Sequence, residues 1–232
     1  MALVHGIMER RKAAGNDGQT HTARPLFIWE PVPGICTPEH IHSFRQAIRQ
    51  VDVVSPNSEE LAGFFAGQCK SLEDMASEVI KWGIGPSIRG SLVVRQGKDG
   101  CSAFSKRHRI HLAAYYTPDA ESQSKVVDPT GGGNAFLGAL AMALSDILCP
   151  NIGEANRLLG LDKDPTSESL PGLTLPLVYA TVAASFVIEQ PGMPICHVQG
   201  DAKETWNGEW FGSRLEAYLS REAANFRRQV KQ

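Results

Sequence analysis

The chain has 232 residues, 42% of them hydrophobic and 21% charged, and its 23 lysines and arginines nearly balance its 25 aspartates and glutamates. This composition excludes a disordered or collagen-like chain and predicts one large globular domain with at most a short appendage. The net charge of -2 provides no global field for collecting nucleic acid or an anionic membrane. No apolar run approaches the ~20 residues of a membrane span.

The five cysteines predict a reducing compartment. They are odd in number, widely spaced and without a C-x-x-C pair, which makes a poor disulfide framework and a poor zinc site. The start of the chain has too few apolar residues for a signal peptide. The sequence therefore predicts a cytoplasmic location, with neither nucleic acid nor a membrane as partner.

The N-terminal half shows strands and helices in alternation. Residues 1–24 are expected to form a helix and a polar tail, and residues 25–232 the α/β domain. Prolines close the apolar run 26–29, which predicts a buried strand. Thr37 is a candidate N-cap, and apolar residues at helical spacing predict a helix over 38–50. A short strand is expected over 51–54.

Further elements follow with clear start and stop signals. Helices are expected from Asn57 to about 66 and from Ser71 to Gly83, where the glycine can close the helix in the left-handed conformation. Apolar segments on either side of a turn at 97–100 predict strands over 91–95 and 101–104, and another strand is expected over 110–112.

The C-terminal half is expected to be mostly helical. Lys125, Val126 and Val127 are interpreted as a strand that leads into three glycines, and an apolar helix is expected over 135–144. Helices are also expected over 150–160 and 174–189. Ser213 is a candidate cap for a last helix with one apolar face, which carries Leu215, Leu219, Ala223 and Phe226. Strands alternating with helices predict an α/β fold with a mainly parallel sheet and helices on both faces.

Three consecutive glycines, Gly131, Gly132 and Gly133, are the most informative feature. At the start of a helix they would expose backbone N–H groups where the helix dipole is positive, which suits an anion. The usual phosphate motifs are absent, because no lysine follows the glycines and Phe136 stands where a third spaced glycine would be. From the glycines alone, a flexible turn into the helix is the favoured interpretation.

Asn57 and Glu60 allow two interpretations. The spacing of an N-cap and a glutamate three residues later is that of a capping box. In the other interpretation, the amide of Asn57 and the carboxylate of Glu60 lie beside Mg²⁺ and a phosphate. Taken alone, the cap is favoured by about three to one, because such signals are common at helix starts.

Three motifs in order resemble the pfkB/ribokinase family of carbohydrate and nucleoside kinases. Residues 53–60 are similar to its N-x-x-E segment, and residues 92–101 (LVVRQGKDGC) to its strand–turn–strand pattern vvvTlGxxGa. Residues 127–136 (VDPTGGGNAF) are similar to its signature D-T-x-G-A-G-D-x-F. The helix over 180–190, with Gly192, resembles the segment that closes the nucleotide site. The resemblance extends over about 26–192 and implies a ribokinase-like fold.

The resemblance also implies roles for individual residues. Gly131, Gly132 and Gly133 would form the anion hole for the γ-phosphate of ATP. Asn57 and Glu60 would lie beside Mg²⁺ and phosphate, with Glu60 holding the metal through water. The nucleotide side would be lined by Gln96, Gly97 and Gly100. Asp128 would contribute to a monovalent-cation site, for K⁺, next to the anion hole.

Asn134 is the first departure from the family pattern. It stands where the family has the aspartate that accepts the proton of the substrate hydroxyl, and an amide is not a base near neutral pH. General base catalysis typically contributes 10²–10⁴-fold. The resemblance therefore implies a weak ATP-dependent kinase acting on a hydroxyl of a sugar- or nucleoside-type small molecule. The alternative is a non-catalytic nucleotide-binding or regulatory protein, a pseudokinase.

The second departure concerns the residues before the first strand. Family members usually carry an N-terminal portion with a glycine-rich sugar motif and lid strands, and no such motif is found before residue 26. We therefore expect the N-terminal part and the lid to be missing, with an edge and an apolar face of the sheet exposed. A partner or a second copy of the chain would cover them.

Overall fold

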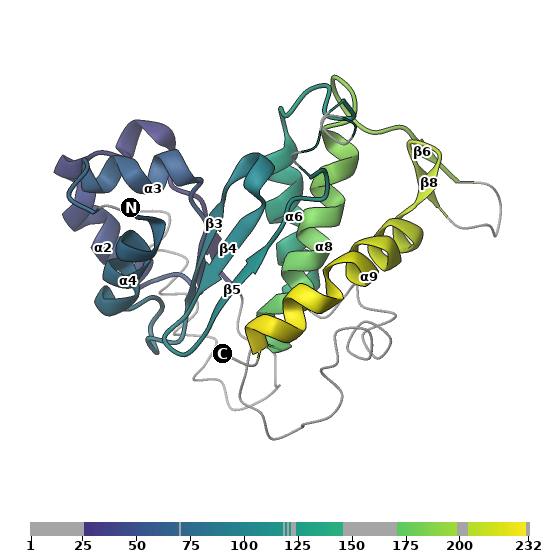
Figure 1. Cartoon of the computed structure of the whole chain (residues 1–232). Helices are drawn as coiled ribbons and strands as arrows, with labels where there is room; N and C mark the ends of the chain where they lie inside the picture. Colours follow the sequence, from purple (N-terminus) through teal and green to yellow (C-terminus); the bar gives the residue numbers. More distant parts are fainter. Residues whose placement is uncertain are drawn as a thin grey trace, which may run out of the picture.

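The computed structural model describes residues 26–69, 71–117, 119, 121, 124–145, 171–198 and 204–230 (Figure 1). They form a five-stranded sheet between two groups of helices, with a small second sheet ahead of the last helix. The helix and tail predicted for residues 1–24 and the helix predicted over 150–160 lie outside the described residues. None of the described helices combines the length and the hydropathy that crossing a bilayer requires.

The larger sheet has the strand order β1-β2-β3-β4-β5. Strands β1 (Ile28–Trp29), β2 (Val53–Val54) and β3 (Ser91–Arg95) run parallel, whereas β4 (Cys101–Phe104) and β5 (Arg109–Leu112) extend the sheet antiparallel. Helices connect the parallel strands, and a tight turn connects β3 to β4. The predicted α/β class is confirmed, and the antiparallel part is the strand–turn–strand expected over 91–104.

Both faces of the sheet are apolar, because successive residues of a strand point to opposite faces. Val53 and Val93 pack into one core, whereas Val54, Leu92 and Val94 pack into the other. Each face therefore needs its own layer of helices, as predicted.

Helices α2 (Ile41–Ile48), α3 (Ser58–Phe65) and α4 (Leu72–Trp82) cover one face. The rings of Phe44 and Phe64 stack there with their centroids 4.1 Å apart. Figure 1 shows this group on one side of the sheet and the later helices on the other. We call this cluster the α2–α4 core.

Helices α6 (Gly132–Leu144), α8 (Pro171–Val187) and α9 (Phe211–Val230) cover the opposite face. Leu140 and Tyr218 are fully buried among them. We call this cluster the α6–α9 core. It lies directly behind the glycines that begin α6, so the position of the glycine turn is fixed by packing.

Two predicted helix ends differ in detail. The helix expected over 38–50 divides into a 3₁₀ turn, η2 (Pro38–His40), and α2, and a further 3₁₀ turn, η1 (Pro33–Ile35), precedes it. Thr37 makes no capping bond, because its hydroxyl is paired with the ring of His40 at 3.0 Å. Ser71 caps α4 as predicted, accepting from the N–H of Asp74 at 3.1 Å.

Gly83 ends α4 with a positive φ of 84° but an extended ψ of 129°, so the left-handed closure expected there is wrong. The next residue, Ile84, is buried in the α2–α4 core. The chain must therefore leave the helix extended to place that side chain.

The strand expected at residues 125–127 is also wrong. Val127 is 59% exposed, and the segment that leads to the glycines is irregular. The N–H groups of Val127 and Asp128 both donate to the carbonyl of Ile188, at 2.8 and 3.1 Å. The end of α8 thus takes up backbone bonds that a neighbouring strand would have made.

The C-terminal part contains strands that were not predicted, β6 (Cys196–His197), β7 (Thr205–Trp206) and β8 (Glu209–Trp210), which form a second sheet. Helix α9 begins directly after β8, so Ser213 lies inside the helix and the predicted cap is wrong. The expected apolar face of this helix is confirmed, since three of the four residues assigned to it are buried: Leu215, Leu219 and Phe226.

Candidate functional site

The glycine turn opens α6 without a side-chain cap. Gly131 occupies the N-cap position with φ 84°, a left-handed conformation that favours glycine. The N–H of Gly132 is bonded to the carbonyl of Pro129 at 3.1 Å. Among the described residues, nothing accepts from the N–H groups of Gly133 and Asn134. Two amides are therefore available to an anion at the positive end of the helix.

A cavity of about 310 Å³ lies beside this turn. It is bounded by the start of α3, the turn after β3, the segment after β5, the glycine turn and the last turns of α8. Five predicted site residues line it: Asn57, Gly97, Gly100, Gly132 and Gly133. The other five are not among its lining residues: Glu60, Gln96, Asp128, Gly131 and Asn134.

The capping box at the start of α3 is confirmed. The side chain of Asn57 accepts from the N–H of Glu60 at 2.8 Å, and Glu60 Oε2 accepts from the N–H of Asn57 at 2.8 Å. A parallel bridge joins Asn57 to Arg95, at the end of β3. The cap therefore fixes Asn57 at the rim of the cavity, where its Nδ2 has no partner among the described residues.

Arg95 is one of the lining residues that the sequence analysis did not predict. Its Nη2 donates to the carbonyl of Ser55 at 3.1 Å, is ion-paired with Glu30, and lies 3.5 Å from Glu60 Oε2. Its Nε is buried, and no described residue accepts from either Nε or Nη1. Nη1 faces Gly133 so closely that a β-carbon at position 133 would overlap with it.

The charge of the cavity wall is positive. Arg95 and Lys98 are the charged side chains among the described lining residues, and none of these described residues is acidic. Glu30 and Glu60 contact the far side of the Arg95 guanidinium. The lining therefore suits an anionic group.

The remaining predicted residues make local contacts. Gln96 accepts from the hydroxyl of Ser102 at 2.7 Å, which holds its side chain on β4. Asp128 accepts from the N–H of Thr130 at 2.9 Å, and hydrogen bonds from the side chain and backbone of Thr130 lower the pKa of the Asp128 carboxyl. Asn134 is exposed in the first turn of α6.

The carboxylates present do not fit a protein-held Mg²⁺. Glu60 is buried, 8% exposed, and its Oε2 is already engaged by an N–H group and a guanidinium. A divalent cation brought to Glu60 would be repelled by the permanent charge of Arg95. Within the described part of the chain, no group of three or more His, Cys, Asp or Glu side chains could hold a metal ion.

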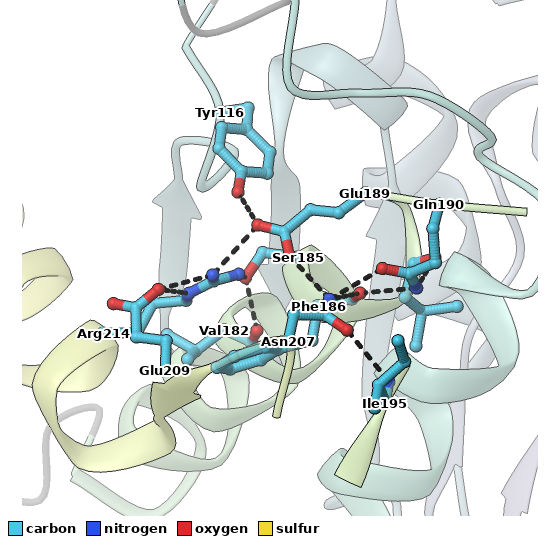
Figure 2. Close-up of polar contacts among 11 residues, drawn as sticks. Tyr116, Val182, Ser185, Phe186, Glu189, Gln190, Ile195, Asn207, Glu209 and Arg214 are labelled. Carbon is cyan, nitrogen blue, oxygen red and sulfur yellow. Dashed lines mark hydrogen bonds and ion pairs between the residues drawn. The ribbon is translucent and has the colours of Figure 1, made fainter. Parts of the chain in front are cut away.

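Tyr115 and Tyr116 line the cavity together with residues from the last turns of α8, and Figure 2 shows the polar contacts around Tyr116. The Tyr116 hydroxyl donates to Glu189, and Arg214 of α9 is ion-paired with Glu189 at 2.9 Å. Burial and the hydrogen bond to Glu189 raise the pKa of Tyr116. Arg214 also donates to the hydroxyl of Ser185 at 3.0 Å. No local sequence pattern predicts this network, because its members come from separate segments.

A family model, described as the pfkB family of carbohydrate kinases, matches residues 31–146, half of the chain. The chain belongs to the pfkB carbohydrate kinase family. The matched segment runs from the residues after β1 to the end of α6, so it includes the capping box, the turn after β3 and the glycine turn.

Two curated relatives are fungal. The uncharacterized Schizosaccharomyces pombe protein C16C9.01c is 32% identical over 213 residues, which cover 84% of this chain and 52% of that protein. The Saccharomyces cerevisiae protein MAK32 is 29% identical over 214 residues, which cover 88% of this chain and 51% of that protein. The chain thus spans about half the length of the curated relatives it matches.

A solved structure shows the same fold. The aminoimidazole riboside kinase of Salmonella enterica, complexed with aminoimidazole riboside and an ATP analog, superposes with a TM-score of 0.56 at 15% identity. The match covers 94% of this chain and 57% of that one. The ribokinase-like fold predicted for this pfkB family member is confirmed.

Proposed function

We propose that the chain binds a nucleotide of the ATP type in the cavity beside α6, with the terminal phosphate at the glycine turn, and that phosphoryl transfer from this site is largely lost. The proposal rests on one combination of features in the described part of the chain: the N–H of Gly133 has no acceptor there, and the cavity wall carries two cationic side chains, Arg95 and Lys98, and no carboxylate. Backbone N–H groups and a cationic fork are the groups that bind phosphate oxygens.

The rest of the cavity suits the other parts of a nucleotide. Phe136 on α6, Ala184 on α8 and Ile188 directly after α8 provide an apolar wall, and Tyr115 provides an aromatic one. A mainly apolar pocket with a few convergent polar groups is typical of small-molecule sites. The ATP analog in the related aminoimidazole riboside kinase supports this class of ligand.

Asn134 is the reason to expect little transfer. Its amide cannot accept the proton of an attacking hydroxyl, and losing a general base typically costs 10²–10⁴-fold in rate. Asn134 is exposed one residue after Gly133, so a hydroxyl acceptor could still reach it. Since phosphoryl transfer depends mainly on positioning and charge stabilisation, slow ATP-dependent phosphorylation of a sugar- or nucleoside-type hydroxyl is the second candidate function.

Calorimetric titration of the full chain with ATP tests the binding proposal. We expect saturable binding that Lys98→Gln weakens by about three- to tenfold, because one charge-assisted contact to phosphate is lost. Lys81→Gln is the matched control, since Lys81 is an exposed lysine of α4 that pairs with Glu78. Absence of ATP binding, or equal weakening in both variants, would refute the proposal.

A transfer assay separates the two candidates. Wild type and Asn134→Asp would be incubated with labelled ATP and a panel of sugars and nucleosides. Measurable transfer by the wild type that rises at least tenfold with aspartate would establish the slow kinase. No transfer by either form, with ATP binding intact, would establish a nucleotide-binding protein without catalysis.

A further inference from the structure

Arg95 is bound by oxygen atoms on one side and open on the other. The carbonyl of Ser55 and the carboxylates of Glu30 and Glu60 surround Nη2, whereas Nη1 faces Gly133 and the cavity without a described partner. The side chain is 14% exposed, so the guanidinium is held in place by the protein. A fixed positive charge therefore lies between two carboxylates, the buried Glu60 and the partly exposed Glu30, and the N–H of Gly133.

The guanidinium occupies the position, between carboxylates and the glycine turn, at which a divalent cation would bridge protein carboxylates and a phosphate. Cations that bridge phosphate oxygens in this way are bound by hard oxygen ligands. Here the oxygen ligands already have a cation, and that cation belongs to the chain. Because a guanidinium stays protonated at all relevant pH values, it fills this position permanently.

We propose that Arg95 takes the place of the divalent cation, so that the cavity binds the terminal phosphate of a nucleotide without requiring Mg²⁺. This inference rests on the proposed nucleotide binding and specifies the form of the ligand as the metal-free nucleotide. Arg95 Nη1, Lys98 and the N–H of Gly133 supply the positive ends of the contacts. Mg²⁺ on the nucleotide would lower the negative charge of the phosphates and would be repelled by Arg95.

The test measures ATP affinity of the full chain by calorimetry in EDTA and again in excess Mg²⁺. We expect the wild type to bind at least as tightly in EDTA as in Mg²⁺. Arg95→Gln should weaken binding in EDTA by about ten- to a hundredfold, because a charge-assisted bond to phosphate is lost. The same variant should bind more tightly when Mg²⁺ is added, since Glu30 and Glu60 are then without a cation.

Two further variants distinguish a loss of phosphate contact from a loss of folding. Arg95→Gln leaves the buried carboxylate of Glu60 without its cation, so the double variant Arg95→Gln/Glu60→Gln removes a negative charge together with the positive one. The double variant should also bind ATP more weakly than the wild type in EDTA, but Mg²⁺ should raise its ATP affinity less than it raises that of Arg95→Gln. Arg109→Gln is the matched control, because Arg109 is an exposed arginine paired with Glu73 and is not among the cavity residues. We expect it to bind as the wild type does.

The outcomes distinguish this inference from the proposed function. Wild-type binding at least tenfold tighter in Mg²⁺ than in EDTA would overturn the role of Arg95 and leave nucleotide binding in place. An equal loss in Arg95→Gln and Arg109→Gln would overturn it as well. No ATP binding in either buffer would refute the proposed function, and the inference with it.

Discussion

Gly133 is the residue at which the glycine turn meets Arg95. A β-carbon at this position would overlap with Arg95 Nη1. In Gly133→Ala the guanidinium must therefore move away from position 133, which disturbs its contacts with Glu30 and Glu60, although the end of a long side chain can shift at small cost. We expect a loss of about 1 kcal/mol in the free energy of unfolding, measured in urea, and a loss of at least tenfold in ATP affinity.

Gly138→Ala is the control in the same helix. No described residue lies within 4 Å of a β-carbon at this position, and Gly138 lies inside α6. Alanine should therefore stabilise the chain by about 0.5–1 kcal/mol through helix propensity and leave ATP affinity unchanged. Equal effects of the two substitutions on ATP affinity would show that the close approach of Arg95 is unimportant.

Single residues were predictable where the signal was local. The capping box of Asn57 and Glu60 follows from two positions three apart, and the structure forms it. Arg95 was not predicted as a site residue, because its partners Glu30 and Glu60 are distant in sequence and meet it only when the strands pair. The one available signal was the arginine itself, which stands where the family pattern vvvTlGxxGa has threonine.

At the scale of elements, Arg214 connects α8 and α9 behind the cavity wall. Its side chain is 5% exposed, is paired with Glu189 and Glu209, and lies 3.7 Å from the ring centroid of Phe186 (Figure 2). Arg214→Met should lower the free energy of unfolding by about 3 kcal/mol, because Glu189 is left without its cation in a mostly buried site. Urea denaturation measures the change.

The matched substitution is Arg109→Met, which removes an exposed ion pair with Glu73. We expect a change within about 1 kcal/mol, as is usual for surface pairs. Since Glu189 also accepts from Tyr116, Arg214→Met should in addition loosen the wall and weaken ATP binding. If both substitutions lower the free energy of unfolding by the same amount, the network does not contribute to holding α8 against α9.

Elements were predictable where hydrophobic period and turn residues agreed. The segment 91–104 met both conditions, and β3, the turn and β4 occur as expected. Two consecutive valines favour a strand over residues 125–127, yet the N–H groups of Val127 and Asp128 pair with the carbonyl of Ile188, directly after α8. These hydrogen bonds depend on a residue some sixty positions away, so no local sequence pattern predicts them. The two-residue strands β6, β7 and β8 are too short for any period to show.

At the scale of the whole molecule, the sheet separates two cores, and each core contains a buried cysteine. Burial raises the pKa of the Cys101 thiol, in the α6–α9 core, to about 12. Burial, followed by the charge of Glu60, raises the pKa of the Cys36 thiol, in the α2–α4 core, to about 11. Both pKa values lie above the ordinary value of 9.0. The folded chain therefore keeps these protons at pH values where the unfolded chain releases them.

The expected consequence is loss of stability in alkali. The contribution of these thiols to the free energy of unfolding is intact below pH 9 and falls as the pH rises, up to about 11 for Cys36 and about 12 for Cys101. Cys101 alone should contribute a slope of about -1.4 kcal/mol per pH unit. Urea denaturation of Cys101→Val from pH 8 to 11 should show a shallower decline than the wild type, whereas Cys196→Ser, at an exposed position on β6, should follow the wild type. Parallel declines of stability in all three proteins would contradict this prediction. They would mean that the Cys101 thiol ionises as easily in the folded chain as in the unfolded one, although it is fully buried in the α6–α9 core.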